Sequence, residues 1–217
     1  MFARVELRVA DLEASRRFYE TVLGALPTGA APREDDCGAT CWGDFAIATA
    51  RDGETPTRNL HVGFAAPSRE AVDAFWEAGV HAGHRDDGPP GPRPQYTPEY
   101  YGAFLRDPDG NSAEAVHHEE VRADGVVDHL WIRVADLAAA CEWYAGHAHA
   151  AGWRVRRAGP ARVQVEHAGA AGSFALVADG LPTTTACIAV PAADPLLAGV
   201  HRDPDGNCVE LLAPGGL

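Results

Sequence analysis

The feature that most constrains the fold of this chain is an internal repeat. The segment RDPDGNSAEAV at residues 106–116 returns as RDPDGNCVELL at residues 202–212, and RVADL at residues 8–12 returns at residues 133–137. Self-similarity of this kind decides the architecture before any local pattern does. The two landmarks lie about 29 residues closer together in the second copy than in the first. The sequence therefore predicts two copies of one unit, with the second copy shortened.

Within each copy, strands run into amphipathic helices. Residues 5–9 alternate apolar and polar side chains, which is the period of a half-buried strand. Asp11 follows where a helix N-cap belongs, and apolar residues recur behind it at helical spacing. A second strand-to-helix unit covers residues 59–83, with Ser68 as its predicted N-cap. The DPDGN segments predict hairpins, because proline presets one turn residue and glycine tolerates positive φ at another.

These patterns predict a series of βαβββ modules. The first copy contains two modules and forms a predicted domain over residues 1–121. The second copy, over residues 126–217, contains one clear module up to about residue 179. Its last unit has room for a first strand and the final hairpin, but little room for a full helix. Fold class and domain organisation thus follow from the repeat.

Composition narrows the classes of function. The formal net charge of −13 argues against a nucleic-acid partner, because phosphates would be repelled. The apolar runs are too short to span a bilayer, and the first residues lack a signal-peptide pattern. Five cysteines at unmatched spacings fit a reducing compartment better than a disulfide framework. We expect a cytoplasmic protein with neither a nucleic-acid nor a membrane partner.

The chain resembles the vicinal oxygen chelate superfamily, which includes glyoxalase I, fosfomycin-resistance transferases, bleomycin-resistance proteins and extradiol dioxygenases. The resemblance rests on VELRVADLEASRRFYETVLG (5–24), NLHVGFAAPSREAVDAFWEAGVHAG (59–83) and GPPGPRPQYTPEYYGAFLRDPDGNSAEAVHH (88–118), and on the two echoes in the second copy. It implies an α+β fold in which tandem βαβββ modules form two cup-shaped mixed sheets. The chain would be a fused pseudo-dimer, and we expect it to be a monomer because its own interface is already satisfied.

The resemblance also implies a metal site with three ligands in each copy, and neither copy has a full set. The positions are a histidine on the first strand, a histidine at the start of the second module, and a glutamate after the DPDGN turn. The first copy has Arg4, His61 and Glu114 at these positions. The second copy has His129, a residue at or near Cys187, and Glu210.

Members of this superfamily often form the site between two units, which implies one complete set here. His129 of the second copy would join His61 and Glu114 of the first. Two imidazoles and a carboxylate suit a divalent metal ion such as Fe, Mn, Zn, Ni or Co. The set of Arg4, Cys187 and Glu210 would be a lost site, in which we expect an ion pair between Arg4 and Glu210.

Two adjacent tyrosines, Tyr100 and Tyr101, are the candidate catalytic residues. Neighbours in a strand point to opposite faces, so only one of them can face the cup. A phenol near a metal can donate a proton or hold a substrate oxygen. The sequence leaves open which tyrosine does so. Trp131 and Arg133 share a face with His129 by alternation and are candidate cup-lining residues.

The resemblance implies two classes of function. The first is a metal-dependent enzyme of the glyoxalase or dioxygenase type, a lyase, isomerase or dioxygenase, that acts on a small oxygen-bearing metabolite chelated by the metal. Glyoxalase I chemistry uses a fourth ligand, a second glutamate, for which Glu54 in a loop is the only nearby candidate. The alternative is a metal-free protein of the bleomycin-resistance type that sequesters a ligand or drug.

Overall fold

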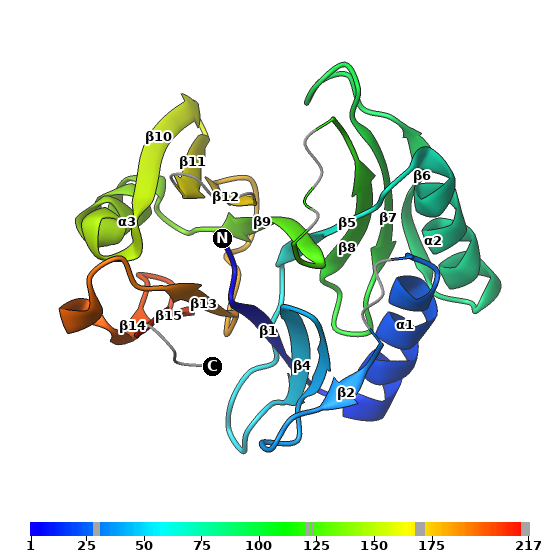
Figure 1. Ribbon diagram of the computed structural model, residues 1–217, viewed down its shortest axis with the longest axis horizontal. Coiled ribbons are helices and arrows are strands. Elements are labelled where there is room, and N and C mark those ends of the chain that lie inside the picture. Colours follow the sequence, from blue (N-terminus) through cyan, green and yellow to red (C-terminus); the bar gives the residue numbers. More distant parts are fainter. Residues whose placement is uncertain (28–30, 120–121, 123, 168–171, 214–217) are drawn as a thin grey trace.

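The computed structural model describes residues 1–27, 31–119, 122, 124–167 and 172–213. The strands form two mixed sheets, of seven and eight strands, and helices lie at the two ends of the molecule (Figure 1). The predicted α+β class is therefore confirmed.

The first copy contains two βαβββ modules, as the sequence predicts. The first module comprises β1 (Arg4–Val9), α1 (Leu12–Gly24), β2 (Arg33–Glu34), β3 (Thr40–Trp42) and β4 (Phe45–Thr49). The second comprises β5 (His61–Ala65), α2 (Arg69–His81), β6 (Arg85–Pro92), β7 (Tyr101–Arg106) and β8 (Ser112–His117). Both helices begin at the predicted caps, since Asp11 accepts a hydrogen bond from the backbone N–H of Ala14 and Ser68 accepts one from that of Ala71.

The second copy has one full module and one reduced module. The full module comprises β9 (Val127–Arg133), α3 (Leu137–Ala151), β10 (Trp153–Gly159), β11 (Arg162–His167) and β12 (Ser173–Val177). The reduced module comprises β13 (Cys187–Pro191), a 3₁₀ turn (Pro195–Leu197), β14 (Gly199–Arg202) and β15 (Cys208–Leu212). The 3₁₀ turn stands where the other modules have a helix, so the predicted shortening is confirmed.

Each sheet combines one module from each copy. The eight-stranded sheet has the order β10-β11-β12-β9-β5-β8-β7-β6, and the seven-stranded sheet has the order β14-β15-β13-β1-β4-β3-β2. The copies join through antiparallel pairs, β5 with β9 in one sheet and β1 with β13 in the other. Side chains from the second module of the first copy and the first module of the second copy therefore share one sheet.

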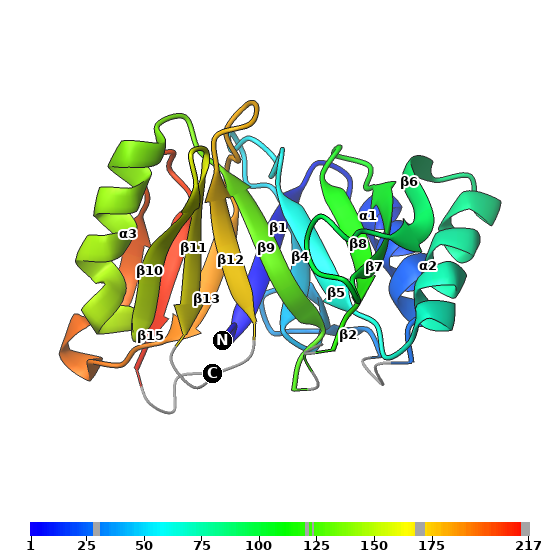
Figure 2. The ribbon, with the colours of Figure 1, turned by 90° about the horizontal axis from the view of Figure 1, so that it is seen from above.

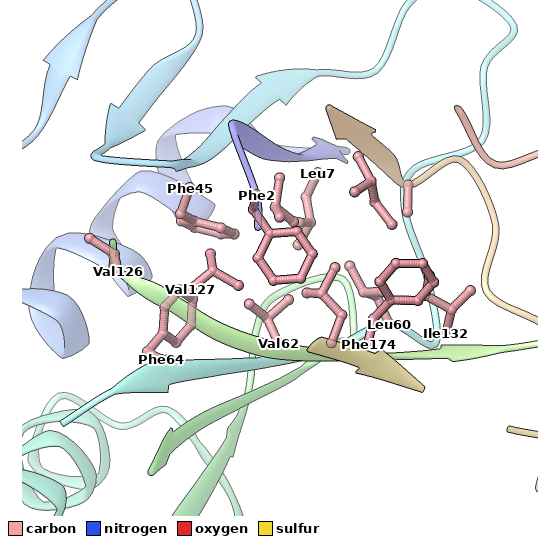
Figure 3. Packing of buried hydrophobic residues seen from close by; sticks show 14 of the residues in the cluster. Phe2, Leu7, Phe45, Leu60, Val62, Phe64, Val126, Val127, Ile132 and Phe174 are labelled. Atoms are coloured by element: carbon pink, nitrogen blue, oxygen red, sulfur yellow. The ribbon is translucent and has the colours of Figure 1, made fainter. Parts of the chain in front are cut away.

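The core lies between the two sheets. Figure 2 shows the eight-stranded sheet in front of the seven-stranded one, and Figure 3 shows apolar side chains filling the space between them. Phe45 and Leu7 enter this core from the seven-stranded sheet, and Val62, Phe64 and Phe174 enter from the other. Because side chains alternate along a strand, residues on either side of Val62 in β5 point to the outer face of the eight-stranded sheet.

The two DPDGN turns tie the first helix of each copy, α1 or α3, to a hairpin. The hydroxyl of Tyr19 in α1 donates to Asp107 at 2.9 Å, and that of Tyr144 in α3 donates to Asp203 at 3.1 Å. These four side chains are buried in equivalent places in the two copies. Buried polar groups need such partners, so the repeated motif has a structural role in both copies.

The asparagine of each turn fixes the start of the neighbouring strand. Asn111 accepts a hydrogen bond from the backbone N–H of Leu60 and donates one to the carbonyl of Thr57. Asn207 makes the equivalent bonds with Ala186 and Thr183. In the first copy this contact holds the residue just before His61.

None of the helices within the described ranges is both long and apolar enough to span a membrane.

Candidate metal centre

The three predicted ligands meet on the outer face of the eight-stranded sheet. They come from the adjacent strands β9, β5 and β8, and Gly63 on β5 pairs with His129 on one side and Glu114 on the other. His61, two residues before Gly63, shares its face. One ligand atom from each of the three side chains lies within 4.8 Å of the others. The geometry is that of a small donor cluster contributed by both copies.

Glu114 is the centre of this cluster. Its Oε2 lies 2.8 Å from His61 Nε2 and 3.3 Å from His129 Nε2. The two imidazole rings stack with centroids 5.4 Å apart. Glu114 is almost fully buried, with 1% of its surface exposed. A buried carboxylate is retained only where it is well paired, and here both histidines serve that purpose.

Tyr100 supports Glu114 from the other side. Its hydroxyl donates to Glu114 Oε1 at 2.8 Å, and both side chains are buried. Tyr101 points to the opposite face, where its hydroxyl donates to Asp73 of α2 at 2.9 Å. Of the two candidate tyrosines, only Tyr100 is therefore brought to the cluster. Burial and the charge of Glu114 raise the pKa of Tyr100, so its phenol stays protonated and acts as a donor.

Asp128 orients His129. The carboxylate oxygen Oδ2 of Asp128 accepts a hydrogen bond from His129 Nδ1 at 2.9 Å and another from His118 Nε2 at 3.1 Å. A proton on Nδ1 leaves Nε2 directed at the cluster, which is the arrangement that a metal-binding histidine needs. Asp128 reaches this position because the pairing of β5 with β9 shifts between Gly63 and Phe64. Asp128 is the extra residue of this bulge, and bulges re-aim side chains in this way.

Two glycines provide the space for the ligands. A Cβ atom at Gly63 would collide with the imidazole of His129, and one at Gly102 would collide with Glu114 Oε1. The backbone thus approaches the ligand side chains as closely as glycine allows. The donor set, its oriented imidazole and this cradle fit a divalent metal ion with nitrogen and oxygen ligands.

The electrostatics of the cluster are those of an imidazolium held between carboxylates. Burial opposes a charge on His129, but hydrogen bonds and attraction to Asp128 and Glu114 raise its pKa to about 9. Burial also disfavours the charge on Glu114, but its bonds to His129 and His61 outweigh this and lower its pKa to about 2. Burial lowers the pKa of His61, which favours the neutral imidazole. A divalent cation would take the place of the His129 proton.

A cavity of about 670 Å³ opens beside the cluster. It is lined by residues of β9, β10, β11 and β12 and of the loop before β7, including Tyr96, Tyr100, His129 and Trp131. The predicted cup-lining position of Trp131 is therefore found. Arg133 instead pairs with Asp179 at 2.9 Å. The cavity is large enough for a small metabolite.

Among the described residues, no second carboxylate joins the cluster as a fourth ligand. Glu54 lies at the other sheet, where it is 3.9 Å from Arg8 of β1. The β12 residues that line the cavity beside His129 include Ser173 and Ala175, neither of which has a carboxylate. This arrangement offers no counterpart to the second glutamate that glyoxalase I chemistry uses.

The equivalent position in the seven-stranded sheet has a different chemistry. Arg4 pairs with Ala189, which in turn pairs with Glu210, so the register matches that of His129, Gly63 and Glu114. The expected ion pair between Arg4 and Glu210 is wrong. Arg4 forms ion pairs with Glu6, two residues along its own strand, and with Asp35 at 2.8 Å. Glu6 is the cross-strand partner of Cys187.

Ala189 adds a second reason why this site differs. Its Cβ occupies the position that Gly63 leaves free for the His129 ring, so an imidazole in place of Arg4 would lack that space. Tyr100 and Gly102 correspond in the repeat to Leu196 and Ala198. The seven-stranded sheet thus keeps the carboxylate position as Glu210, but it lacks the two histidines, the phenol and the glycine cradle.

Sequence reasoning missed the residues around the ligands, namely Asp128, His118, Gly63 and Gly102. No spacing argument singles out His118 in the sequence, but its ring stacks on that of Tyr100 with centroids 5.9 Å apart. Gly63 gave a usable signal, since a glycine inside a strand indicates a close approach of another group. Asp128 gave none, because strict alternation would place it on the face opposite His129.

Fold, site and sequence together define the class of protein. Residues 2–115 match the model of the glyoxalase/bleomycin resistance protein/dioxygenase superfamily. The match covers more than half of the chain, and the chain belongs to this family. The comparison with curated proteins found no match.

Solved structures are similar to this chain in two ways. Glyoxalase I from Zea mays aligns over 98% of this chain and 92% of its own length, with 17% identity and a TM-score of 0.62. At this identity the likeness concerns the fold alone. A glyoxalase/bleomycin resistance protein from Albidiferax ferrireducens T118 is 38% identical over 54% of this chain and 99% of its own length, with a TM-score of 0.48.

Proposed function

We propose that the chain is a metal-dependent enzyme that acts on a small oxygen-bearing metabolite, with His61, Glu114 and His129 as the metal ligands. The observation that carries the proposal is the convergence of these three side chains from three strands to within 4.8 Å of one another. The seven-stranded sheet has no such cluster among the described residues, although it repeats the same hairpin. The complete set in one sheet and the incomplete set in the other favour a single working centre.

The protein's contribution would be to hold the ligands and keep water out. Asp128 fixes the imidazole of His129, and Tyr100 fixes the carboxylate of Glu114. A bound divalent ion would supply a Lewis acid for two oxygens of the substrate. The phenol of Tyr100, already a donor at the cluster, is placed to hold a substrate oxygen beside it. Lyase, isomerase and dioxygenase chemistry all begin from this arrangement.

A metal-free binding protein of the bleomycin-resistance type is the second candidate. The observation that favours it is that the cluster is internally satisfied: Glu114 accepts hydrogen bonds from Tyr100 and His61 and lies within ion-pair distance of His129. Such a network is stable without a metal. The cavity would then sequester a ligand, and the net charge of −13 would suit a cationic one.

Metal content decides between these functions. The purified protein would be loaded anaerobically with divalent metals, and bound metal would be counted by mass spectrometry. We expect about one ion per chain in the wild type, loss of that ion in His61→Ala and His129→Ala, and full retention in Glu210→Ala, the matched glutamate of the second copy. A wild type that binds no metal would favour the sequestering function. Loss of metal in Glu210→Ala would mean that the metal binds at the seven-stranded sheet, which would contradict the proposed site.

We also infer that the chain acts as a monomer in the cytoplasm. Each sheet already contains a module from both copies, so the pairing that would join two chains is made within one. All five cysteines are free, which suits a reducing compartment. Light scattering of the purified protein would test the oligomeric state.

A further inference from the structure

Arg162 is an arginine with an unsatisfied donor at the wall of the cavity. It lies on β11 and lines the cavity, and its Nε is buried without a hydrogen-bond partner. No carboxylate among the described residues forms an ion pair with it. The other cavity-lining arginine, Arg156, is paired with Glu166 at 2.8 Å. Arg162 is therefore the cavity arginine whose charge is not balanced within the protein.

The guanidinium of Arg162 is held in a defined orientation. Its Cζ lies over the ring of Trp131, 5.0 Å from the ring centroid. Its Nη2 donates to Gln164 Oε1 at 3.2 Å, and Gln164 is fixed in turn by the bond from its Nε2 to Ser173 Oγ at 2.8 Å. The stack and the amide thus position the group, and its Nε–H remains without an acceptor. A planar fork of this kind matches the two oxygens of a carboxylate.

Burying the Nε–H of this partly exposed arginine without a partner is unfavourable. A buried donor that lacks an acceptor loses its hydration and gains nothing in return, and the loss is larger for a charged group. Burial accordingly lowers the pKa of Arg162. The protein keeps a cation in the cavity wall that an anionic ligand would satisfy.

Trp131 connects Arg162 with the donor cluster. The indole ring that carries the guanidinium also lies 5.0 Å from the ring centroid of His61. Tyr96 packs edge-on against the same indole, with centroids 5.6 Å apart. A small molecule in the cavity can therefore contact the cluster at one end and Arg162 at the other.

We propose that Arg162 binds a carboxylate or similar oxyanion of the substrate, at the end remote from the oxygens held at the cluster. The substrate class is then a small anionic metabolite, with two neighbouring oxygens for the metal and a separate acidic group for Arg162. This inference rests on the metal-dependent function proposed above. The strongly negative chain would otherwise repel such a substrate, so a local cation is needed for its recognition.

Matched ligand pairs test the proposal. The zinc-loaded protein would be titrated by calorimetry with 3,4-dihydroxybenzoate, 3,4-dihydroxyphenylacetate and 3-(3,4-dihydroxyphenyl)propanoate, each compared with its neutral amide. The catechol oxygens are the same in each pair, and the three lengths vary the reach of the acid. We expect at least one acid to bind about tenfold or more tightly than its amide, because a hydrogen bond to a charged partner is gained.

Two arginine variants show whether the preference for the acid over the amide comes from Arg162. In Arg162→Gln the acid and the amide should bind equally, whereas Arg156→Gln, which changes a cavity arginine already paired with Glu166, should keep the preference. Circular dichroism would confirm that both variants fold. Equal binding of every acid and amide by the wild type would overturn the proposal, as would a preference that survives Arg162→Gln.

Zinc stoichiometry separates this proposal from the function on which it rests. If zinc binds but no acid is preferred, the anion site is wrong and the metal centre stands. If zinc does not bind, the same titrations of the chelator-treated protein test whether Arg162 binds the acid group in the absence of a metal. An acid preference lost in Arg162→Gln then supports the anion site although the metal function has failed, and no preference overturns both.

Discussion

Gly63 lies directly beneath the imidazole of His129, its partner across the β5–β9 pair. The close approach is possible because glycine has no Cβ, and the pseudo-equivalent residue in the other sheet is Ala189. The methyl group of Ala189 therefore makes the difference: β5 has space for an imidazole ring above Gly63, and β13 does not. The ligand set and the backbone beneath it changed together in the second sheet.

Gly63→Ala should weaken metal binding by about 10- to 100-fold, the range seen when the support of a metal ligand is disturbed. The new Cβ would push the ring of His129 away from Glu114. Chelator competition would measure the affinity. Gly146→Ala is the matched control, because a Cβ there meets nothing within 4 Å. Unchanged affinity in Gly63→Ala would show that the ring does not need this space.

Tyr100→Phe should reduce metal affinity by about tenfold and stability by about 1–3 kcal/mol, because Glu114 Oε1 loses its donor in a buried setting. Tyr101→Phe should leave metal affinity unchanged, since it removes only the bond to Asp73 on the other face. Urea unfolding and chelator competition would measure the two quantities. Equal metal affinities in the two variants would contradict a role for Tyr100 at the cluster.

Much of the fold could be predicted from sequence because the repeat fixes it. Two landmarks recur in the same order, and their shorter interval predicts the reduced last module, which has a 3₁₀ turn at Pro195–Leu197. The helix caps at Asp11 and Ser68 were predictable because capping is local. That each sheet combines modules from both copies depends on contacts between distant parts of the sequence, and only the family resemblance suggested it.

The surroundings of the site could not be predicted, for physical reasons. Alternation places Asp128 on the core face, but the bulge at Gly63/Phe64 turns it toward His129. Arg4 was expected to pair with Glu210, but its long side chain instead reaches Asp35 in a loop before β3. Neither the bulge nor the loop leaves a clear pattern in the sequence.

Asp128→Ala should weaken metal binding by about 10- to 100-fold, because His129 loses the acceptor that fixes its ring. Asp128→Asn should reduce metal affinity less, since the amide oxygen can still accept a hydrogen bond from His129 Nδ1. Asp124→Asn serves as a control just before β9, where the carboxylate accepts a hydrogen bond from Arg122 Nε. A metal affinity in Asp128→Ala equal to that of the wild type would contradict the orienting role.

Asp107 should make folding stability fall as the pH rises from about 4 to 6. Burial raises the pKa of this carboxyl to about 6 from its ordinary value of 3.8, although the hydrogen bonds from Asn111 and Tyr19 act to lower it. In this window the folded chain still holds the proton that the unfolded chain has released, so each rise in pH favours unfolding.

The full cost of ionising Asp107 in the folded state is about 3 kcal/mol, taken from the size of this pKa difference. Urea unfolding of the wild type and of Asp107→Asn between pH 4 and pH 7 would measure it. The variant no longer accepts the hydrogen bond from Asn111 Nδ2 at this position and should be less stable at pH 4. The difference in unfolding free energy between the two proteins should narrow by up to about 3 kcal/mol as the pH rises. All other titrating groups are shared by the two proteins, so a gap that stays constant across this range would mean that Asp107 ionises as freely in the folded chain as in the unfolded one.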